Sequence, residues 1–150
     1  GGVLSRQCPS GQALSGITSN DKVDRLWGIS CKAFKENKTC RWSGYVNEYW
    51  GTIDFKCADN EVIAGAYSVH STIKWRFYCC SAPGFVTFNC KEEPKINYWQ
   101  ENFRWTVPSS NFLTGVKSFF DYPACRWSFT YCQMKLFGMR RSMTRFADVP

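Results

Sequence analysis

The sequence predicts an all-β protein: one disulfide-rich domain over residues 1–150, built from three quasi-repeats of antiparallel strands with approximate threefold symmetry. The first observation is a phrase that occurs three times, in Leu26–Cys31, Ile73–Cys80 and Cys125–Cys132. In each copy a Trp is followed by an apolar residue two positions later and by a cysteine four or five positions later. This alternation is typical of a strand with one buried face.

The second observation is a partner phrase upstream of each copy. Its pattern is aliphatic, any residue, Gly, small or aliphatic, any residue, Ser, at Leu14–Ser19, Ile63–Ser68 and Leu113–Ser118. The distance from Gly to Trp is 11, 10 and 12 residues, so two fixed anchors flank a variable loop. A repeated supersecondary unit has this signature, and we place the units at about residues 8–31, 57–80 and 112–132.

The third observation is the spacing of turn residues along the chain. Turn signals recur about every ten residues and no stretch keeps a helical period, as expected of an all-β domain. The tail Met134–Phe146 is compatible with one short helix or a strand, and we expect a strand. Lys32–Thr39 is expected to be an exposed loop. The other expected strands are Gln12–Ser19, Arg25–Cys31, two strands around a turn within Cys40–Cys57, Val62–Ser68, Phe85–Cys90 and Tyr98–Val107.

Composition favours a secreted protein. The 150 residues include 7 Trp, 7 Tyr and 12 Phe, which is enough for one aromatic-rich core. Nine cysteines without a Cys-x-x-Cys pair, together with a single histidine, indicate disulfides in an oxidising compartment and no metal site. Asn37 begins a glycosylation sequon. No run of 18 apolar residues is present, so no transmembrane segment is expected.

The cysteines of the middle repeat should have different partners. Neighbours in a strand point to opposite faces, so Cys79 and Cys80 should reach separate parts of the fold. Cys31 and Cys79 lie an even number of positions after the Trp of their repeat, so they share its strand face. Cys80 and Cys132 lie one position later and belong to the opposite face. An odd count leaves one thiol unpaired or paired between chains, and eight cysteines allow 105 connectivities, which periodicity leaves open.

Several phrases resemble the dermatopontin family. They are Cys8–Gln12, Asp24–Trp27 ending at Cys31, Trp75–Cys80, and Arg126–Phe129 ending at Cys132. Only the first copy keeps the family's Asp-Arg-x-Trp motif. The resemblance implies the disulfides Cys8–Cys31, Cys40–Cys79, Cys57–Cys80 and Cys90–Cys132. It leaves Cys125 unpaired or interchain, which would allow a homodimer.

The same resemblance implies a secreted, extracellular, non-enzymatic glycan-binding protein, similar to a lectin or agglutinin, that acts in cell adhesion or aggregation without a cofactor. The alternatives are a structural extracellular-matrix protein that binds proteoglycan or collagen, and a cytolytic toxin. The net charge of +7 favours anionic partners. We therefore expect extracellular glycans or glycosaminoglycans and cell-surface glycoproteins as partners, and not nucleic acid.

Candidate ligand-binding residues lie outside the repeated strands. The Trp of each repeat alternates with apolar residues, so we assign Trp27, Trp75 and Trp127 to the core. Sugar sites combine an acidic or amide side chain with an aromatic face, and variable loops are where binding residues concentrate. No catalytic residue is expected, because the sequence has no nucleophile motif or phosphate-binding loop. The candidates are Asn20 and Asp21 in the first loop, His70 in the second, Phe120, Asp121 and Tyr122 in the third, and Arg140 and Arg141 in the basic tail.

Overall fold

A computed structural model shows an all-β protein, as the sequence predicts. It describes residues 3–20, 26–48, 52–69, 74–93, 103–121 and 124–137. Within these ranges no helix is long and apolar enough to cross a membrane. The described strands are β1 (Val3–Gln7), β2 (Gln12–Asn20), β3 (Leu26–Ala33), β4 (Thr39–Trp42), β5 (Asp54–Lys56), β6 (Val62–Val69), β7 (Lys74–Ser81), β8 (Phe85–Glu92), β9 (Phe103–Thr106), β10 (Phe112–Asp121) and β11 (Ala124–Leu136).

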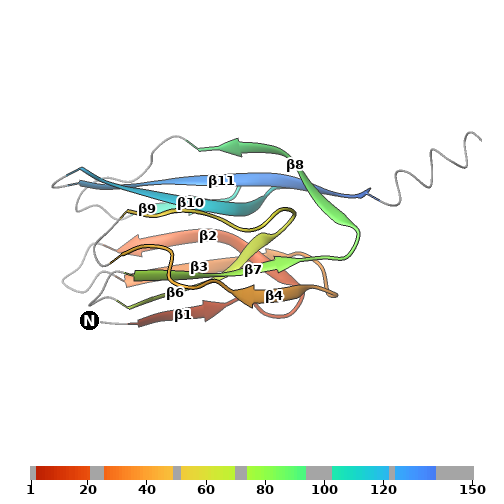
Figure 1. The fold of residues 1–150 in the computed structure, drawn as a ribbon, viewed down its shortest axis with the longest axis horizontal. Helices are drawn as coiled ribbons and strands as arrows, with labels where there is room; N and C mark the ends of the chain where they lie inside the picture. Colours follow the sequence, from red (N-terminus) through yellow and green to blue (C-terminus); the bar gives the residue numbers. More distant parts are fainter. Residues whose placement is uncertain are drawn as a thin grey trace, which may run out of the picture.

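The strands form three antiparallel sheets that run along the long axis of the molecule (Figure 1). Their strand orders are β1-β6-β7-β4, β5-β10-β11-β8 and β3-β2-β9. Each sheet contains one hairpin, β6–β7, β10–β11 or β2–β3, whose two strands carry the two repeated phrases. The sequence pattern therefore predicted the three hairpins correctly.

The sheets exchange strands in a cyclic order. The strand that precedes each hairpin in the sequence pairs with a different hairpin: β1 with β6, β5 with β10 and β9 with β2. The segment Cys40–Cys57 does contain two strands, β4 and β5, but they lie in different sheets and do not form the expected local pair. Each sheet is thus completed only by a segment from elsewhere in the chain.

The repeated glycine lies where an edge strand approaches the hairpin. In all three hairpins the strand register shifts next to this residue. A Cβ on Gly16, Gly65 or Gly115 would lie 2.9, 2.7 or 2.9 Å from a backbone carbonyl oxygen of the neighbouring edge strand. Only a residue without a side chain permits such an approach, which explains why glycine is the constant element of the upstream phrase.

The core lies between the inner faces of the three hairpins. The side chains of Trp75 and Trp127 are 5 % and 6 % exposed, and their rings meet edge to face at 5.6 Å. Phe129 is 1 % exposed and stacks on Trp105 at 4.3 Å. These contacts confirm the core assignment of two of the repeated Trp residues, while the side chain of Trp27 lies outside the described part of the structure.

Two disulfides agree with the pairing that the family resemblance implies, and two do not. Cys8–Cys31 and Cys90–Cys132 are present as expected. The expected bridges Cys40–Cys79 and Cys57–Cys80 are wrong, because the structure joins Cys40 to Cys80 and Cys57 to Cys79.

Strand geometry explains the corrected pairing. Cys40 lies directly opposite Cys80 in the β4–β7 ladder, with 4.1 Å between their Cα atoms. Cys79 points to the other face of β7, into the main core together with Cys57. Cys80 instead belongs to a separate apolar cluster. Neighbouring cysteines on one strand do reach different partners, as the alternation of side chains predicts.

The C-terminal stretch continues the last strand. β11 extends to Leu136, so the first residues of the tail expected to form a strand do form one. The rest of that tail lies outside the described residues.

Candidate functional site

The ligand-binding residues expected from the sequence belong to the three hairpin loops and the C-terminal tail. The strand ends that flank the three hairpin loops lie together at one end of the molecule, at the left of Figure 1. Asn20 ends β2, and Phe120 and Asp121 end β10, but their side chains are outside the description. The remaining candidates, Asp21, His70, Tyr122, Arg140 and Arg141, lie outside the described residues, so this group stays a prediction.

The structure reveals a different candidate on the outer face of the first sheet. Along β7 the side chains of the main core alternate with residues on the opposite face, where Arg76 lies and where Tyr78 packs against the smaller apolar cluster around Cys80. In the ladder Tyr67 on β6 lies opposite Arg76, and Trp42 on β4 lies opposite Tyr78. Three strands therefore place aromatic and basic side chains side by side.

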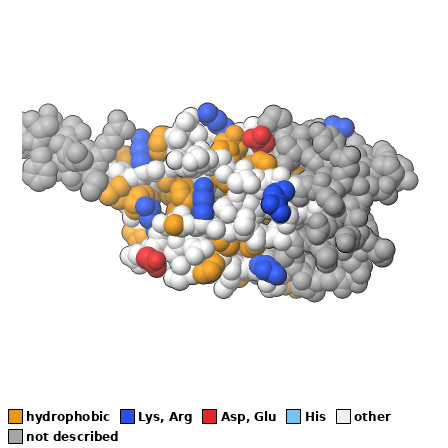
Figure 2. Space-filling view, turned by 180° about the vertical axis from the view of Figure 1, so that it is seen from behind, with side chains coloured by type: hydrophobic (Ala, Val, Ile, Leu, Met, Phe, Trp, Pro, Cys, Tyr) orange, Lys and Arg blue, Asp and Glu red, His pale blue; other side chains and the backbone are white. Residues whose placement is uncertain are grey.

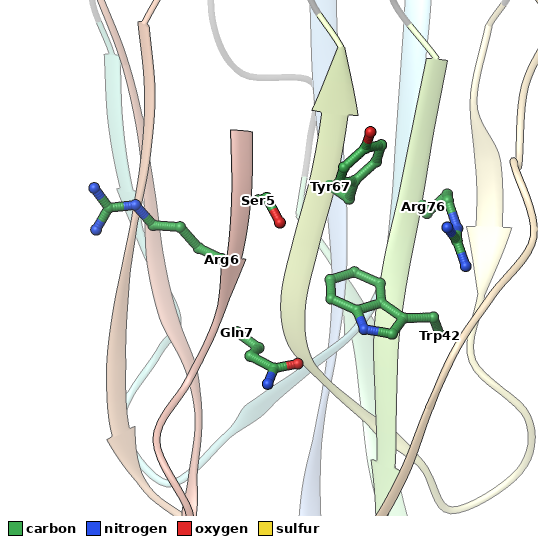
Figure 3. A pocket seen from close by; sticks show the side chains of 6 residues that line it. All are labelled: Ser5, Arg6, Gln7, Trp42, Tyr67 and Arg76. Atoms are coloured by element: carbon green, nitrogen blue, oxygen red, sulfur yellow. The ribbon is translucent and has the colours of Figure 1, made fainter. Parts of the chain in front are cut away.

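Trp42, Tyr67 and Arg76 border an open groove of about 410 Å³. We call it the basic-aromatic groove. Figure 3 shows the rings of Trp42 and Tyr67 between Arg76 on one side and the β1 side chains on the other, with Arg6 pointing away from the rings. The residues that line it are Ser5, Arg6, Gln7, Trp42, Tyr67 and Arg76.

Gly65 lies where the strands of this sheet pack closely. In the sheet it lies between Gln7 on β1 and Tyr78 on β7. A Cβ there would lie 2.7 Å from the carbonyl oxygen of Arg6 and 3.0 Å from the Tyr78 Cβ. The glycine therefore allows β1, which carries Ser5 and Gln7, to lie directly beside the β6–β7 hairpin.

Arg76 is held in place from one side. Its Nε donates a hydrogen bond of 2.9 Å to the carbonyl oxygen of Ser43. Ser43 is itself fixed, because its backbone N–H donates to the carbonyl of Phe77 at 2.8 Å and its Oγ accepts from the Phe77 N–H at 2.9 Å. The guanidinium carbon lies 5.9 Å from the ring centre of Trp42 and 6.0 Å from that of Tyr67. Cation–π contacts of this kind orient the guanidinium further.

The terminal nitrogens of Arg76 make no hydrogen bond to the described residues. The ion pairs found among those residues, Arg41–Glu61 and Lys117–Glu92, lie elsewhere. A second cation, Lys74, lies 4.7 Å from the ring centre of Tyr45 beside the groove, and Tyr45 is 51 % exposed. The groove therefore combines positive charge with accessible aromatic surface.

Positive charge is widespread on the described surface. On the face shown in Figure 2, Lys and Arg side chains lie among hydrophobic patches and acidic side chains are sparse. This distribution agrees with the net charge of +7. It favours anionic partners in general, whereas the groove adds a defined geometry.

The groove offers chemical groups that are suited to ligand binding. Aromatic rings present flat apolar faces, hydroxyl and amide groups such as those of Ser5 and Gln7 can exchange hydrogen bonds with ligand hydroxyls, and a guanidinium binds acceptors through a planar pair of N–H groups. The six lining residues include no carboxylate, imidazole or thiol that could act as an acid, base or nucleophile.

Sequence reasoning missed this site although part of the signal was present. The phase that assigns Trp75 to the core also places Arg76 and Tyr78 on the opposite face. Trp42 belongs to an expected strand, but its place beside β7 depends on long-range pairing. Ser5, Arg6 and Gln7 of β1 lie in a segment for which the sequence pattern predicts no strand.

The fold defines a disulfide-linked, all-β protein with an open basic-aromatic groove on one sheet. Comparison with known proteins makes this specific: the chain matches the family model described as Dermatopontin over residues 2–136 and belongs to the dermatopontin family. This family is non-catalytic. Membership and the four disulfides are consistent with an extracellular location.

Three curated relatives illustrate the range of the family. The chain is 32% identical over 145 residues to a hemagglutinin/amebocyte aggregation factor of Limulus polyphemus, covering 89% of this chain and 84% of the relative. It is 26% identical to the dermatopontin of Biomphalaria glabrata, with 85% and 92% covered, and 28% identical to Millepora cytotoxin-1 of Millepora dichotoma, with 84% and 61% covered. No solved structure matches the chain significantly.

Proposed function

We propose that this chain is a secreted, non-enzymatic glycan-binding protein that acts in cell adhesion or aggregation, and that the basic-aromatic groove is its binding site. The observation that carries the proposal is the placement of the Trp42 and Tyr67 rings beside an oriented Arg76 on an accessible sheet face. The relative named hemagglutinin/amebocyte aggregation factor supports this function class.

Sugar recognition has chemical requirements that the groove meets. The C–H face of a sugar ring packs on an aromatic side chain, while its hydroxyl groups need donors and acceptors at the edge. Trp42 and Tyr67 offer the rings, and Gln7, Ser5 and Arg76 surround them. Extracellular glycans, glycosaminoglycans and the glycans of cell-surface glycoproteins are ligands of this kind.

Haemagglutination and its inhibition by sugars test the proposal. The wild-type protein should bind a set of glycans on an array, and soluble ligand should inhibit agglutination of erythrocytes. Trp42→Ala should weaken binding, because it removes an aromatic face that also packs on Tyr78 with a ring distance of 4.9 Å. Phe137→Ala is the matched control, since Phe137 is 47 % exposed and does not line the groove. Circular dichroism would confirm that both variants fold.

Four outcomes would contradict the proposal or move the site. Binding to no glycan would refute the function. Equal loss of binding in the control variant would refute the location. Lysis of erythrocytes without agglutination would favour a cytolytic protein, and binding to collagen that no sugar inhibits would favour a structural matrix protein.

We also propose the internal symmetry of the chain, its glycosylation, the state of Cys125 and further glycan contacts. The cyclic exchange of edge strands supports an approximate threefold relation among the three hairpins. Asn37 is exposed in the turn between β3 and β4, which supports its glycosylation. Cys125 lies opposite Phe120 near the end of the β10–β11 hairpin, and we propose that it stays unpaired or joins two chains in a homodimer. The hairpin loops remain candidate contacts for the same glycans.

A further inference from the structure

The three sheets differ at the position that Arg76 occupies. Arg76 directly follows the Trp of the second repeated phrase, and the corresponding residues are Gly28 in the first and Ser128 in the third. Gly28 has no side chain. Ser128 is buried, and its hydroxyl donates a 2.6 Å hydrogen bond to the carbonyl oxygen of Glu93. Of the three, the sheet that contains the β6–β7 hairpin is therefore the one that presents a cation at this position.

A second position shows the same divergence. Two residues after the repeated glycine stand Thr18, Tyr67 and Lys117. Lys117 is a cation, but its Nζ lies 2.9 Å from the carboxylate of Glu92. Glu92 is two residues beyond the cysteine of the cross-strand disulfide in β8, as Trp42 is in β4. Where the β6–β7 sheet has the ring of Trp42 beside Arg76, the β10–β11 sheet has the carboxylate of Glu92, which pairs with Lys117.

The charge of Lys117 is thus satisfied within its own sheet. The hydrogen bond from Lys117 to Glu92, and the negative charge of that carboxylate, raise the pKa of Lys117 above its usual value. An incoming anion would have to compete with Glu92. At Arg76 the Nε is bound to a backbone carbonyl, and the described residues include no carboxylate paired with the guanidinium.

We propose that, among the described residues, the basic-aromatic groove forms the single anionic-sugar subsite, in which the terminal nitrogens of Arg76 bind a sulfate or carboxylate of a sugar that packs on Trp42 or Tyr67. This inference rests on the proposed glycan-binding function and narrows it to one ligand class and one repeat. A guanidinium whose Nε is occupied still offers its two terminal N–H groups as a parallel pair, the geometry that matches both anions.

A single subsite would have a consequence for aggregation. A chain that binds glycan only through this groove cannot bridge two cells, so cross-linking through the groove requires association of chains. Avidity then arises from linked copies of the same site and not from the three repeats of one chain.

Isothermal titration calorimetry on the full chain tests the subsite. The probes are a heparin-derived tetrasaccharide, which carries sulfate, a hyaluronan tetrasaccharide, which carries carboxylate without sulfate, and the neutral chitotetraose. We expect one site per chain for at least one anionic probe, and weaker binding of the neutral one. Binding of the heparin fragment alone identifies sulfate as the recognised group, whereas equal binding of both fragments identifies an anion of either kind.

Variants at corresponding positions separate the subsite from general charge. Arg76→Gln should weaken binding of the anionic probe about 10- to 100-fold, because it removes a charge-assisted pair of hydrogen bonds. Arg76→Lys keeps the positive charge without the planar pair of N–H groups, so its affinity should lie between those of the wild type and Arg76→Gln. Lys117→Gln removes one charge from another sheet's outer face and should leave binding unchanged. Thermal unfolding shows whether each variant remains folded.

The results distinguish the failure of the subsite from that of the function. Two or three sites per chain, unchanged binding in folded Arg76→Gln, or equal weakening by Lys117→Gln would overturn the single subsite. Tight binding of the neutral probe alone would leave glycan binding standing and refute the anionic subsite. Binding of no probe, together with an empty glycan array, would refute the proposed function itself.

Discussion

Replacement of cysteine pairs tests the disulfide connectivity and its energetic role. In Cys40→Ala/Cys80→Ala one complete bridge is lost, while Cys57–Cys79 stays intact. The sequence separation of the lost bridge is 40 residues. Loop-closure entropy for a loop of that length gives a destabilisation of about 4 kcal/mol at 25 °C. The variant should fold, and its thiol count under denaturing conditions should equal that of the wild type.

The crossed variant Cys40→Ala/Cys79→Ala should behave differently. It removes one cysteine from each bridge and leaves Cys57 and Cys80 on different faces of the sheet. The second bridge has a sequence separation of 22 residues and contributes about 3.4 kcal/mol, so the loss should total about 7 kcal/mol. That is comparable to the whole stability of many domains.

Urea unfolding and thiol titration with Ellman's reagent measure both effects. The crossed variant should show two additional thiols and a much lower urea midpoint than Cys40→Ala/Cys80→Ala. Equal stability and equal thiol counts for the two variants would refute the connectivity and the strand-face reasoning behind it. Peptide mapping by mass spectrometry under non-reducing conditions provides an independent check.

Three further predictions concern packing and backbone contacts. Phe129→Ala should lower the free energy of unfolding by about 3–5 kcal/mol in urea titration, because Phe129 is 1 % exposed and stacks on another ring; a loss below 1 kcal/mol would contradict its central place in the core. Ser43→Ala should lower the free energy of unfolding by about 1–3 kcal/mol, because it removes the hydroxyl that accepts a hydrogen bond from the Phe77 N–H. Ser43→Thr keeps a hydroxyl and should lose much less stability. Equal effects of the two variants would contradict the role of this hydrogen bond. Gly65→Ala should lower the free energy of unfolding by at least about 1–3 kcal/mol, because its Cβ would lie 2.7 Å from a carbonyl oxygen of β1. The control Gly44→Ala, whose Cβ would have no atom within 4 Å, should change stability by less than about 0.5 kcal/mol. Similar melting temperatures for the two variants would refute the close approach of β1.

Cysteine phase shows where reasoning from the residues went further than analogy. The positions of Cys31 and Cys79 after their Trp residues are equivalent, and so are those of Cys80 and Cys132. The structure follows this equivalence. The bridges to Cys31 and Cys79 have Cα–Cα distances of 5.8 and 5.9 Å, while those to Cys80 and Cys132 are both 4.1 Å. The two wrong pairs came from the family resemblance and not from the strand geometry.

The candidate site was beyond reach of the sequence for a different reason. Its residues come from three segments, around Ser5–Gln7, Trp42 and Tyr67–Arg76. Short edge strands such as β1 and β4 carry little periodic signal, because only a few residues alternate. Their position depends on which hairpin edge offers hydrogen bonds and space, and that is settled by contacts far apart in the sequence.

The sequence by itself determined the all-β class, the three hairpins and the inward side of their strands, because alternation of side chains is a local property of each strand. It also predicted that Cys79 and Cys80 would have different partners. The tertiary structure alone decided which edge strand joins which hairpin, since pairing energy arises between distant segments. That choice placed β1 and β4 beside the middle hairpin, and it is the physical reason why an oriented Arg76 faces the rings of Trp42 and Tyr67 there.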